Sequence, residues 1–286
     1  MSHPSPSAQD HKSSSARPVG VFDSGIGGLT VARAIRDLLP NECIFYIGDT
    51  ARVPYGGKSP ATVQRYAMEI ATVLAAENCK AIVVACNTAS ALALEVLQKE
   101  MLIPVIGVIH PGAAAAIAAT KSGHIGVIGT RATINSRAYE IAIKSQRQDI
   151  RVTSLACPLL VPLIEEGWVE SEVTESVIRK YVQGMLDAHI DTLVLGCTHY
   201  PLLRGAIQRV VGESVTLVDS AENSALALRA LLTEREISSQ IAPQDPLHVA
   251  LTDLPDHFLR VAQEALHLDM TAPTICDLPQ TARRSN

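Results

Sequence analysis

Two cysteines are the side chains in this sequence best placed to do chemistry. Cys86 follows the apolar run Val-Val-Ala and precedes Asn-Thr, and Cys197 follows Val-Leu-Gly and precedes Thr-His. A short apolar run that ends in polar residues is typical of a buried parallel strand leading into a turn and a helix. Open α/β sheets bind ligands at the carboxyl ends of such strands. If both thiols face one pocket, they could act as two bases on opposite faces of one carbon atom.

A lone buried cysteine is usually a small apolar core residue, but two at equivalent strand ends favour a functional role. The amino end of the following helix would favour the thiolate. An ordinary thiol, with a pKa of about 8.5, is only about a few per cent ionised at neutral pH, so each cysteine needs local help. His199 could handle the proton or charge of Cys197, and Asp23 could do so for Cys86. Alternatively, Asp23-Ser24 caps the next helix, and His199 is a satisfied buried histidine.

Other polar groups are expected at the same rim. Their hydroxyls and amides suit a carboxylate or an ammonium group, although each could instead cap a helix: Asn87, Thr88, Thr130 and Thr198. The loop 49–58 carries Arg52, Tyr55 and Gly56 and is either a lid or an ordinary surface loop. Residues 25–28, Gly-Ile-Gly-Gly, could bring backbone amides close to a small anion, but their spacing matches neither common nucleotide motif. Glu165-Glu166 reads as a solvated acidic pair.

Strands and helices alternate along the chain, which predicts parallel sheets with helical crossovers. We expect strands at 18–23, 43–48, 81–85, 105–109, 124–128, 152–156, 192–196 and 216–219. Helices are expected at 29–39, 61–77, 89–100, 113–120, 130–143, in two stretches within 159–188, and at 201–211 and 221–235. The segments Gly20–Ser24 and Gly126–Thr130 recur at nearly the spacing of the two cysteines. The pattern therefore predicts two pseudo-symmetric α/β lobes.

The lobes divide the chain unevenly. Residues 1–17 are rich in Ser and Pro and are expected to be a disordered tail. Residues 18–112 together with 220–286 would form a discontinuous first lobe, and 113–219 the second. The helix 221–235 would cross back to the first lobe, which the segment 248–268 would complete.

Composition narrows the class of protein. The 286 residues carry a net charge of −5, which argues against nucleic-acid binding as the main role. No apolar stretch is long enough to span a membrane, and the first residues lack the apolar core of a secretory signal. A cytoplasmic protein is therefore expected, with its six cysteines as thiols. No CxxC pair or zinc-ligand grouping is present, so no metal site is predicted.

Taken together, these residues resemble the glutamate racemases, a family of cofactor-independent amino-acid racemases. The resemblance runs from about residue 18 to residue 268 and rests on the segments GVFDSGIGGLTV (20–31), YIGDTARVPYG (46–56), VVACNTASA (83–91), PVIGVIHPG (104–112), GVIGT (126–130), CPLLVPLIEEG (157–167), LVLGCTHYPLL (193–203) and HVALTDLPDHFLRVAQEAL (248–266).

The resemblance implies two α/β lobes with the active site in the cleft between them. Cys86 and Cys197 would be the catalytic bases, assisted by Asp23 and His199 respectively. A glutamate of the LIEEG segment is also implied, with Glu165 the first choice and Glu166 the alternative. The substrate would be held by Asp23-Ser24, Tyr55-Gly56, Asn87-Thr88, Thr130 and Thr198-His199, with no cofactor and no metal.

The implied reaction interconverts L-glutamate and D-glutamate, supplying D-glutamate for peptidoglycan. Cys197 would take the α-proton from the L-enantiomer and Cys86 from the D-enantiomer. The family also implies a homodimer and raises the question of activation by a cell-wall precursor. It leaves room for an interaction with DNA gyrase, which nothing in this sequence indicates.

Three other readings stay open at this point. An aspartate or hydantoin racemase would share the lobes and the paired thiols. A hydrolase could use Cys197 and His199 alone, which would leave Cys86 unexplained. A binding or regulatory module would need no catalytic residues at all.

Overall fold

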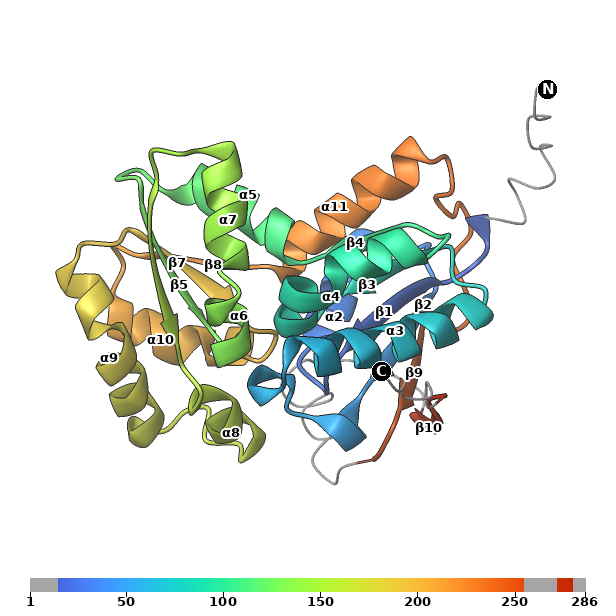
Figure 1. Ribbon diagram of the computed structural model, residues 1–286, viewed down its shortest axis with the longest axis horizontal. Coiled ribbons are helices and arrows are strands. Elements are labelled where there is room, and N and C mark those ends of the chain that lie inside the picture. Colours follow the sequence, from blue (N-terminus) through green and yellow to red (C-terminus); the bar gives the residue numbers. More distant parts are fainter. Residues whose placement is uncertain (1–14, 255–271, 280–286) are drawn as a thin grey trace.

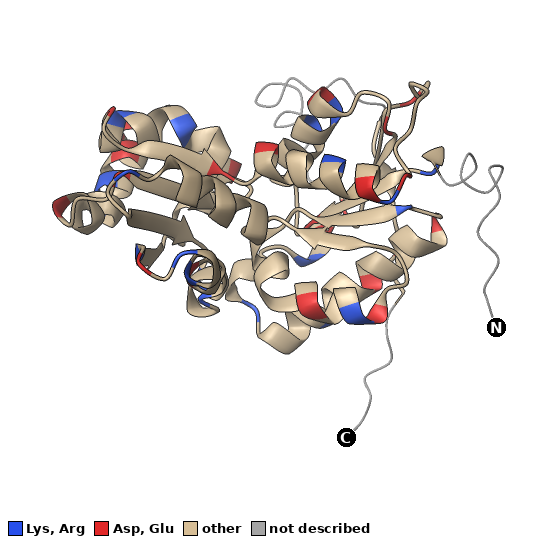
Figure 2. Ribbon diagram, turned by 90° about the horizontal axis from the view of Figure 1, so that it is seen from above, with Lys and Arg blue, Asp and Glu red and all other residues tan. Residues whose placement is uncertain are grey.

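The protein folds into two parallel sheets, each flanked by helices on both faces (Figure 1). The computed structural model describes residues 15–254 and 272–279. The expected two-lobe α/β fold is confirmed. Charged residues lie mainly on the outer helices and loops, and the strands are largely uncharged (Figure 2). Buried apolar strands between amphipathic helices are what the alternating sequence pattern requires.

The larger sheet has the strand order β10-β9-β2-β1-β3-β4, and all neighbours are parallel. Its strands are β1 (Val19–Asp23), β2 (Ile44–Gly48), β3 (Ala81–Val84), β4 (Val105–Gly107), β9 (Leu247–Leu251) and β10 (Thr274–Ile275). Helices α2 (Leu29–Leu38) and α11 (Ala221–Glu234) cover one face, and α3 (Pro60–Ala76) and α4 (Asn87–Glu100) the other. Central β1 is buried along its whole length, so its carboxyl end delivers Asp23 into the interior.

The smaller sheet has the order β6-β5-β7-β8, again all parallel. Its strands are β5 (His124–Gly129), β6 (Arg151–Ala156), β7 (Thr192–Gly196) and β8 (Thr216–Asp219). Helices α5 (Ile109–Ala119) and α7 (Ala138–Gln146) pack on one face. The other face is covered by α8 (Leu160–Glu165), α9 (Glu172–Asp187) and α10 (Arg204–Val211). A short helix, α6 (Arg131–Asn135), follows β5.

The lobes are joined by α5 and α11, which pack against each other (Figure 1). Helix α5 runs straight through the expected lobe boundary at residues 112 and 113. Of the tail expected at residues 1–17, positions 1–14 lie outside the described residues. Arg17 is described, and its guanidinium donates to the carbonyl oxygens of Asn78 and Cys79. The closing helical part of 248–268 also falls largely outside the described residues.

Most predicted elements are present within one or two residues, and β7 and β8 have the predicted bounds. The predicted strand 105–109 is wrong at its end, because β4 stops at Gly107 and α5 begins at Ile109 rather than Ala113. Proline inside a helix usually breaks it, and Pro111 is the third residue of α5. In the first turn of a helix, however, a backbone N–H has no partner inside the helix, so proline is tolerated there.

Two predicted helices are interrupted. The helix expected at 130–143 is two helices, α6 and α7, separated at Arg137, whose φ is 56°. The hydroxyl of Ser136 donates to the carbonyl of Thr133 and accepts from the N–H of Ala138, which ends one helix and starts the next. The helix expected at 201–211 begins as a 3₁₀ turn, η3 (Tyr200–Leu203), before α10. The expected loop 49–58 contains two further 3₁₀ turns, η1 (Thr50–Arg52) and η2 (Tyr55–Gly57).

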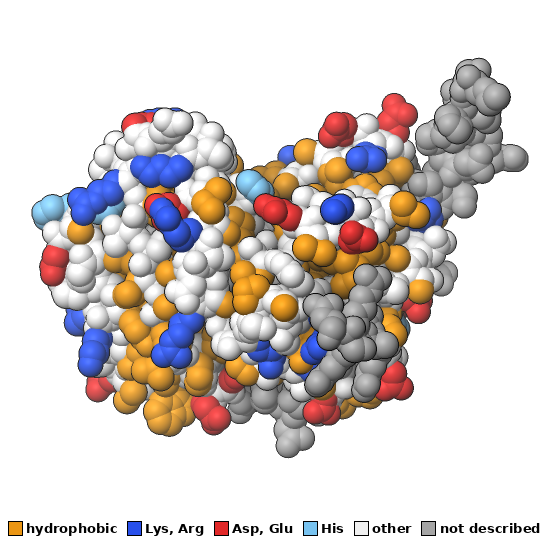
Figure 3. Space-filling view, viewed as in Figure 1, with side chains coloured by type: hydrophobic (Ala, Val, Ile, Leu, Met, Phe, Trp, Pro, Cys, Tyr) orange, Lys and Arg blue, Asp and Glu red, His pale blue; other side chains and the backbone are white. Residues whose placement is uncertain are grey.

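Hydrophobic side chains gather on the surface of the smaller-sheet lobe over α8 and α9 (Figure 3). Exposed apolar residues in this part of the chain include Leu159, Trp168 and Val173. Among the described residues, none of the helices has the length and hydropathy needed to cross a bilayer.

A buried ion pair ties four segments of the larger-sheet lobe together. The ammonium group of Lys80 lies 2.5 Å from the Glu42 carboxylate and donates to the carbonyls of Ser15 and Ile237. Lys80 and Glu42 are both 2% exposed.

We expect Lys80→Met to lower the free energy of unfolding by about 3–5 kcal/mol, because it leaves a buried carboxylate without its cation. The exposed Lys99→Met is the control and should change it by less than about 0.5 kcal/mol. Urea titration of both variants measures the difference. Equal stability of the two variants would contradict a structural role for the pair.

Candidate active site

The carboxyl ends of strands from both sheets meet between the lobes. β1 ends at Asp23, β3 leads into Cys86, β5 into Thr130 and β7 into Cys197. Both cysteines are buried, at 4% and 6% exposure. Parallel strands align their carboxyl ends at one sheet edge, so two facing edges bring residues distant in sequence into one place. The structure thus brings the two predicted cysteines and Asp23 together.

Cys86 is the N-cap residue of α4. Its Sγ accepts from the N–H of Ala89 at 3.4 Å and lies 3.6 Å from Oγ of Ser24. Burial raises the pKa of the Cys86 thiol, and the negative charge of Asp23 raises it further; the contacts with Ala89 and Ser24 lower it, and the result is about 12. The helix terminus therefore acts in the expected direction but is outweighed. Cys86 is a protonated thiol at neutral pH.

Cys197 has a cation beside it instead. Its Sγ lies 4.0 Å from Nδ1 of His199, and Nε2 of the same ring lies 3.4 Å from Oε1 of Glu165. Burial lowers the pKa of His199, but its contacts with Cys197 and Glu165 raise it more, to about 10. His199 is therefore an imidazolium at neutral pH.

The glycine turn after β1 brings the lobes into contact. A Cβ added at Gly27 would lie 2.5 Å from Oγ1 of Thr198 and 2.6 Å from Nδ1 of His199, so only glycine fits there. The Asp23 carboxylate accepts from the N–H of Gly25 at 3.0 Å and from the Thr198 hydroxyl at 3.3 Å. The alternative in which Asp23-Ser24 caps the next helix is wrong, because α2 has Gly28 at its N-cap position and no side-chain cap.

Three threonines form a second contact between the lobes. The hydroxyl of Thr88 lies 2.9 Å from that of Thr130 and 3.2 Å from that of Thr133. Thr130 also caps α6 by accepting from the N–H of Thr133, so it serves as a cap as well as lying at the rim. Thr133 was not predicted. Its only sequence signal is its place three residues after the predicted Thr130.

The loop 49–58 is anchored to the larger sheet. The hydroxyl of buried Tyr55 donates to the carboxylate of Asp49, which also accepts from Arg52 at 2.7 Å and 2.9 Å. Burial and the negative charge of Asp49 raise the pKa of Tyr55. A Cβ added at Gly56 would lie 2.7 Å from Cβ of Thr130, so the loop also presses against the second lobe. The hydroxyl of Tyr55 is therefore already engaged by Asp49.

Asn87 has a partner that sequence reasoning missed. Its Oδ1 accepts from the hydroxyl of Tyr139, across the lobes, at 2.7 Å, and both residues are 2% exposed. A tyrosine on the inner face of a helix reads as an ordinary core residue, so no pattern in the sequence singled it out.

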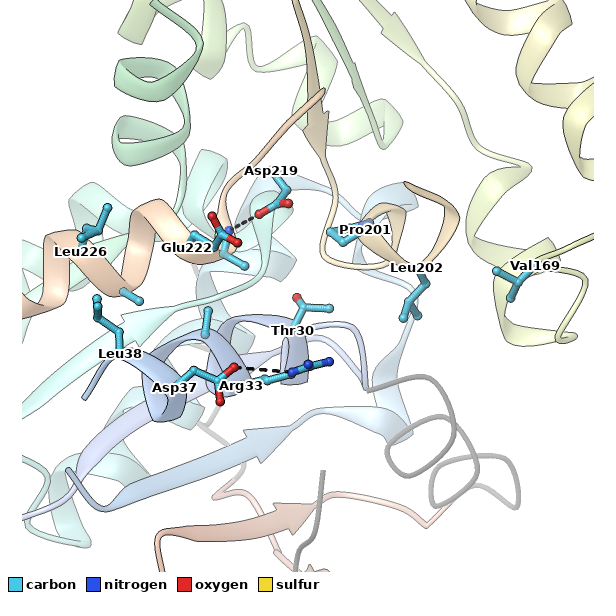
Figure 4. Close-up of a pocket in the computed structure, with 13 residues that line it drawn as sticks. Thr30, Arg33, Asp37, Leu38, Val169, Pro201, Leu202, Asp219, Glu222 and Leu226 are labelled. Atoms are coloured by element: carbon cyan, nitrogen blue, oxygen red, sulfur yellow. Dashed lines mark hydrogen bonds and ion pairs between the residues drawn. The ribbon is translucent and has the colours of Figure 1, made fainter. Parts of the chain in front are cut away.

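A cavity of about 860 Å³ lies apart from the cysteines, between α2, α11 and η3 (Figure 4). Its walls include Thr30, Arg33, Leu202, Glu222 and Leu226, and none of the predicted site residues. Among the described residues, no cluster of three or more His, Cys, Asp or Glu side chains could hold a metal ion.

Comparison with known proteins identifies the family. A profile of the Asp/Glu/Hydantoin racemases matches residues 29–228. The chain belongs to this racemase family. It is 52% identical over 250 residues to a glutamate racemase of Geobacter metallireducens, an alignment that covers 87% of this chain and 93% of the relative.

Solved structures agree. A glutamate racemase from Francisella tularensis in complex with D-glutamate is 39% identical, with a TM-score of 0.87 over 93% of this racemase and 100% of that chain. An Escherichia coli glutamate racemase with L-glutamate and the activator UDP-MurNAc-Ala is 29% identical, with a TM-score of 0.76 over 92% and 99%. Family membership makes the chain an isomerase, which removes support for a hydrolase built on Cys197 and His199 and for a module without catalysis.

The ion pair between His199 and Glu165 gives a test that distinguishes Glu165 from Glu166 as the partner of the imidazole. We expect NMR of the His199 imidazole to show the protonated ring through neutral pH. Glu165→Gln should move its titration to lower pH, because a negative charge that favours the imidazolium is lost. Glu166→Gln, one residue on and exposed, should leave the titration unchanged. A wild-type midpoint near the ordinary value of about 6.5 would contradict the assignment.

Proposed function

We propose that this racemase interconverts L-glutamate and D-glutamate by moving protons between the α-carbon of the substrate and two thiols, Cys86 and Cys197. One observation carries the proposal. The two thiols are both buried, and each follows a strand of a different sheet, β3 before Cys86 and β7 before Cys197, where the hydrogen bond from Thr198 to Asp23 joins the two strand ends. The choice of glutamate as the substrate rests on the similarity to glutamate racemases. Inverting a stereocentre needs removal of a proton on one face and delivery on the other, which two opposed groups provide.

The unequal surroundings of the thiols assign the first roles. Beside the His199 imidazolium, Cys197 is suited to act as a thiolate that takes the α-proton of L-glutamate. The electron pair of the broken C–H bond passes to the α-carbon and its carboxylate. Cys86, which carries its proton at neutral pH, then donates that proton to the opposite face. In the reverse direction, the roles exchange.

The polar rim would hold the substrate and stabilise the carbanion. The proposed contacts are Asp23, Ser24, Tyr55, Gly56, Asn87, Thr88, Thr130, Thr198 and His199. A substrate ammonium group bound beside Asp23 would offset the negative charge that holds the Cys86 proton, which would ease proton removal by Cys86 in the reverse direction. Fixed hydroxyl and amide groups around the α-carboxylate would favour the developing charge, since they need no reorganisation. No cofactor or metal is needed for these steps.

The wider role rests on the resemblance to the glutamate racemases. We propose a cytoplasmic enzyme that acts as a homodimer and supplies D-glutamate for peptidoglycan. The two lobes, 18–112 with 220–286 and 113–219, would separate to admit the substrate, because both thiols are buried in the present arrangement.

Replacing either thiol should abolish turnover. Cys86→Ala and Cys197→Ala are each expected to lower the racemisation rate by about a thousandfold or more, in line with the loss of a general acid or base. Cys276→Ala, which removes a partly exposed thiol outside the site, is the matched control and should keep wild-type activity. The circular dichroism signal of glutamate, which has opposite sign for the two enantiomers, follows the reaction. Near-normal turnover in either site variant would refute the two-thiol mechanism.

Solvent labelling tests the substrate and the bond that breaks. In deuterated water, L-glutamate should become D-glutamate that carries deuterium at the α-carbon, and L-aspartate should react far more slowly. Mass spectrometry and chiral chromatography measure both. Product without deuterium at the α-carbon would contradict proton delivery from a thiol that exchanges with solvent. Faster turnover of L-aspartate than of L-glutamate would overturn the substrate assignment.

A further inference from the structure

Tyr139 stands in α7 with its ring held in a slot between two glycines. A Cβ added at Gly196 would lie 3.1 Å from Cε2 of the ring, and one added at Gly112 would lie 3.3 Å from both Cε1 and the hydroxyl oxygen. Gly196 immediately precedes Cys197. The ring is thus fixed against the strand that delivers the second thiol.

The hydroxyl of Tyr139 reaches into the other lobe. It donates at 2.7 Å to Oδ1 of Asn87, which immediately follows Cys86 and opens α4. One side chain therefore connects the residue before one thiol with the residue after the other.

The direction of this hydrogen bond follows from the atom that Asn87 presents. The Tyr139 hydroxyl is the donor, because an amide oxygen has no hydrogen to give and can only accept. A tyrosine that donates requires the amide oxygen, not the amide nitrogen, to face it.

The amide nitrogen of Asn87 is consequently left for another acceptor. Nδ2 is buried and has no hydrogen-bond partner within the described chain. Buried polar groups are almost always paired, so an unpaired donor beside a thiol calls for a ligand that accepts.

We propose that Tyr139 is a positioning residue, which holds the Asn87 amide so that Nδ2 donates to a carboxylate oxygen of the bound substrate. The inference rests on the proposed glutamate reaction. A flipped amide would turn its oxygen toward the carboxylate and replace an attraction with a repulsion. Tyr139 thereby acts on substrate binding without touching the substrate.

Tyr139→Phe tests this with little change of shape, since only the hydroxyl is lost. We expect kcat/KM for glutamate to fall by about tenfold, as for loss of one oriented hydrogen bond, with KM rising more than kcat falls. The increase in KM is expected because the carboxylate is bound before the proton moves. Tyr181→Phe removes a hydroxyl from the same lobe, where it contacts only the N–H of Leu159 at 3.4 Å among its described hydrogen bonds, and should leave the kinetics unchanged.

A double-mutant cycle separates positioning from general structural support. In an Asn87→Ala background, Tyr139→Phe should have little further effect on α-proton exchange, followed by NMR in deuterated water. Wild-type KM and kcat in Tyr139→Phe would overturn the inference, as would a full additive loss in the double variant. If the wild-type protein itself fails to racemise glutamate, the proposed function fails instead, so the two failures are distinguishable.

Discussion

The glycine turn after β1 lies so close to Thr198 and His199 that one added carbon at Gly27 would overlap both. The turn and the Thr198-His199 pair follow strands of different sheets, so this contact sets how closely the two sheet edges approach. The hydrogen bond from Thr198 to Asp23 spans the same junction. Residues of both lobes are therefore buried together at this junction. Charges interact strongly there because little water screens them.

Similar strand ends are given opposite electrostatic surroundings in the two lobes. Cys86 lies beside the carboxylate of Asp23 and keeps its proton, whereas Cys197 lies beside the cation of His199, which Glu165 supports from its other side. In the proposed mechanism, this difference lets two chemically identical side chains begin the reaction as acid and base. Environments that differ in this way are a recurring means of assigning proton donors and acceptors. The bound substrate would change this balance, because its ammonium group adds a positive charge near Asp23.

The sequence reveals those parts of the site that depend on local patterns. Cys86 and Cys197 could be predicted because an apolar run followed by polar residues indicates a strand end, and strand ends gather at sheet edges. The start of α5 was predicted four residues too late, at residue 113 rather than Ile109, and Pro111 is accommodated in the first turn of that helix. The break between α6 and α7 at Arg137 is indicated only weakly in the sequence, by the preceding pair Asn135-Ser136. Tyr139 could not have been predicted, because Gly112 and Gly196 form its slot only after the two sheets have packed.

A crystal structure of the protein with bound D-glutamate tests the central claim most directly. The account predicts that Sγ of Cys86 and Sγ of Cys197 lie on opposite faces of the substrate α-carbon, each within reach of the position of its hydrogen. Both sulfurs on one face, or either one turned away from the α-carbon into its own lobe, would contradict it.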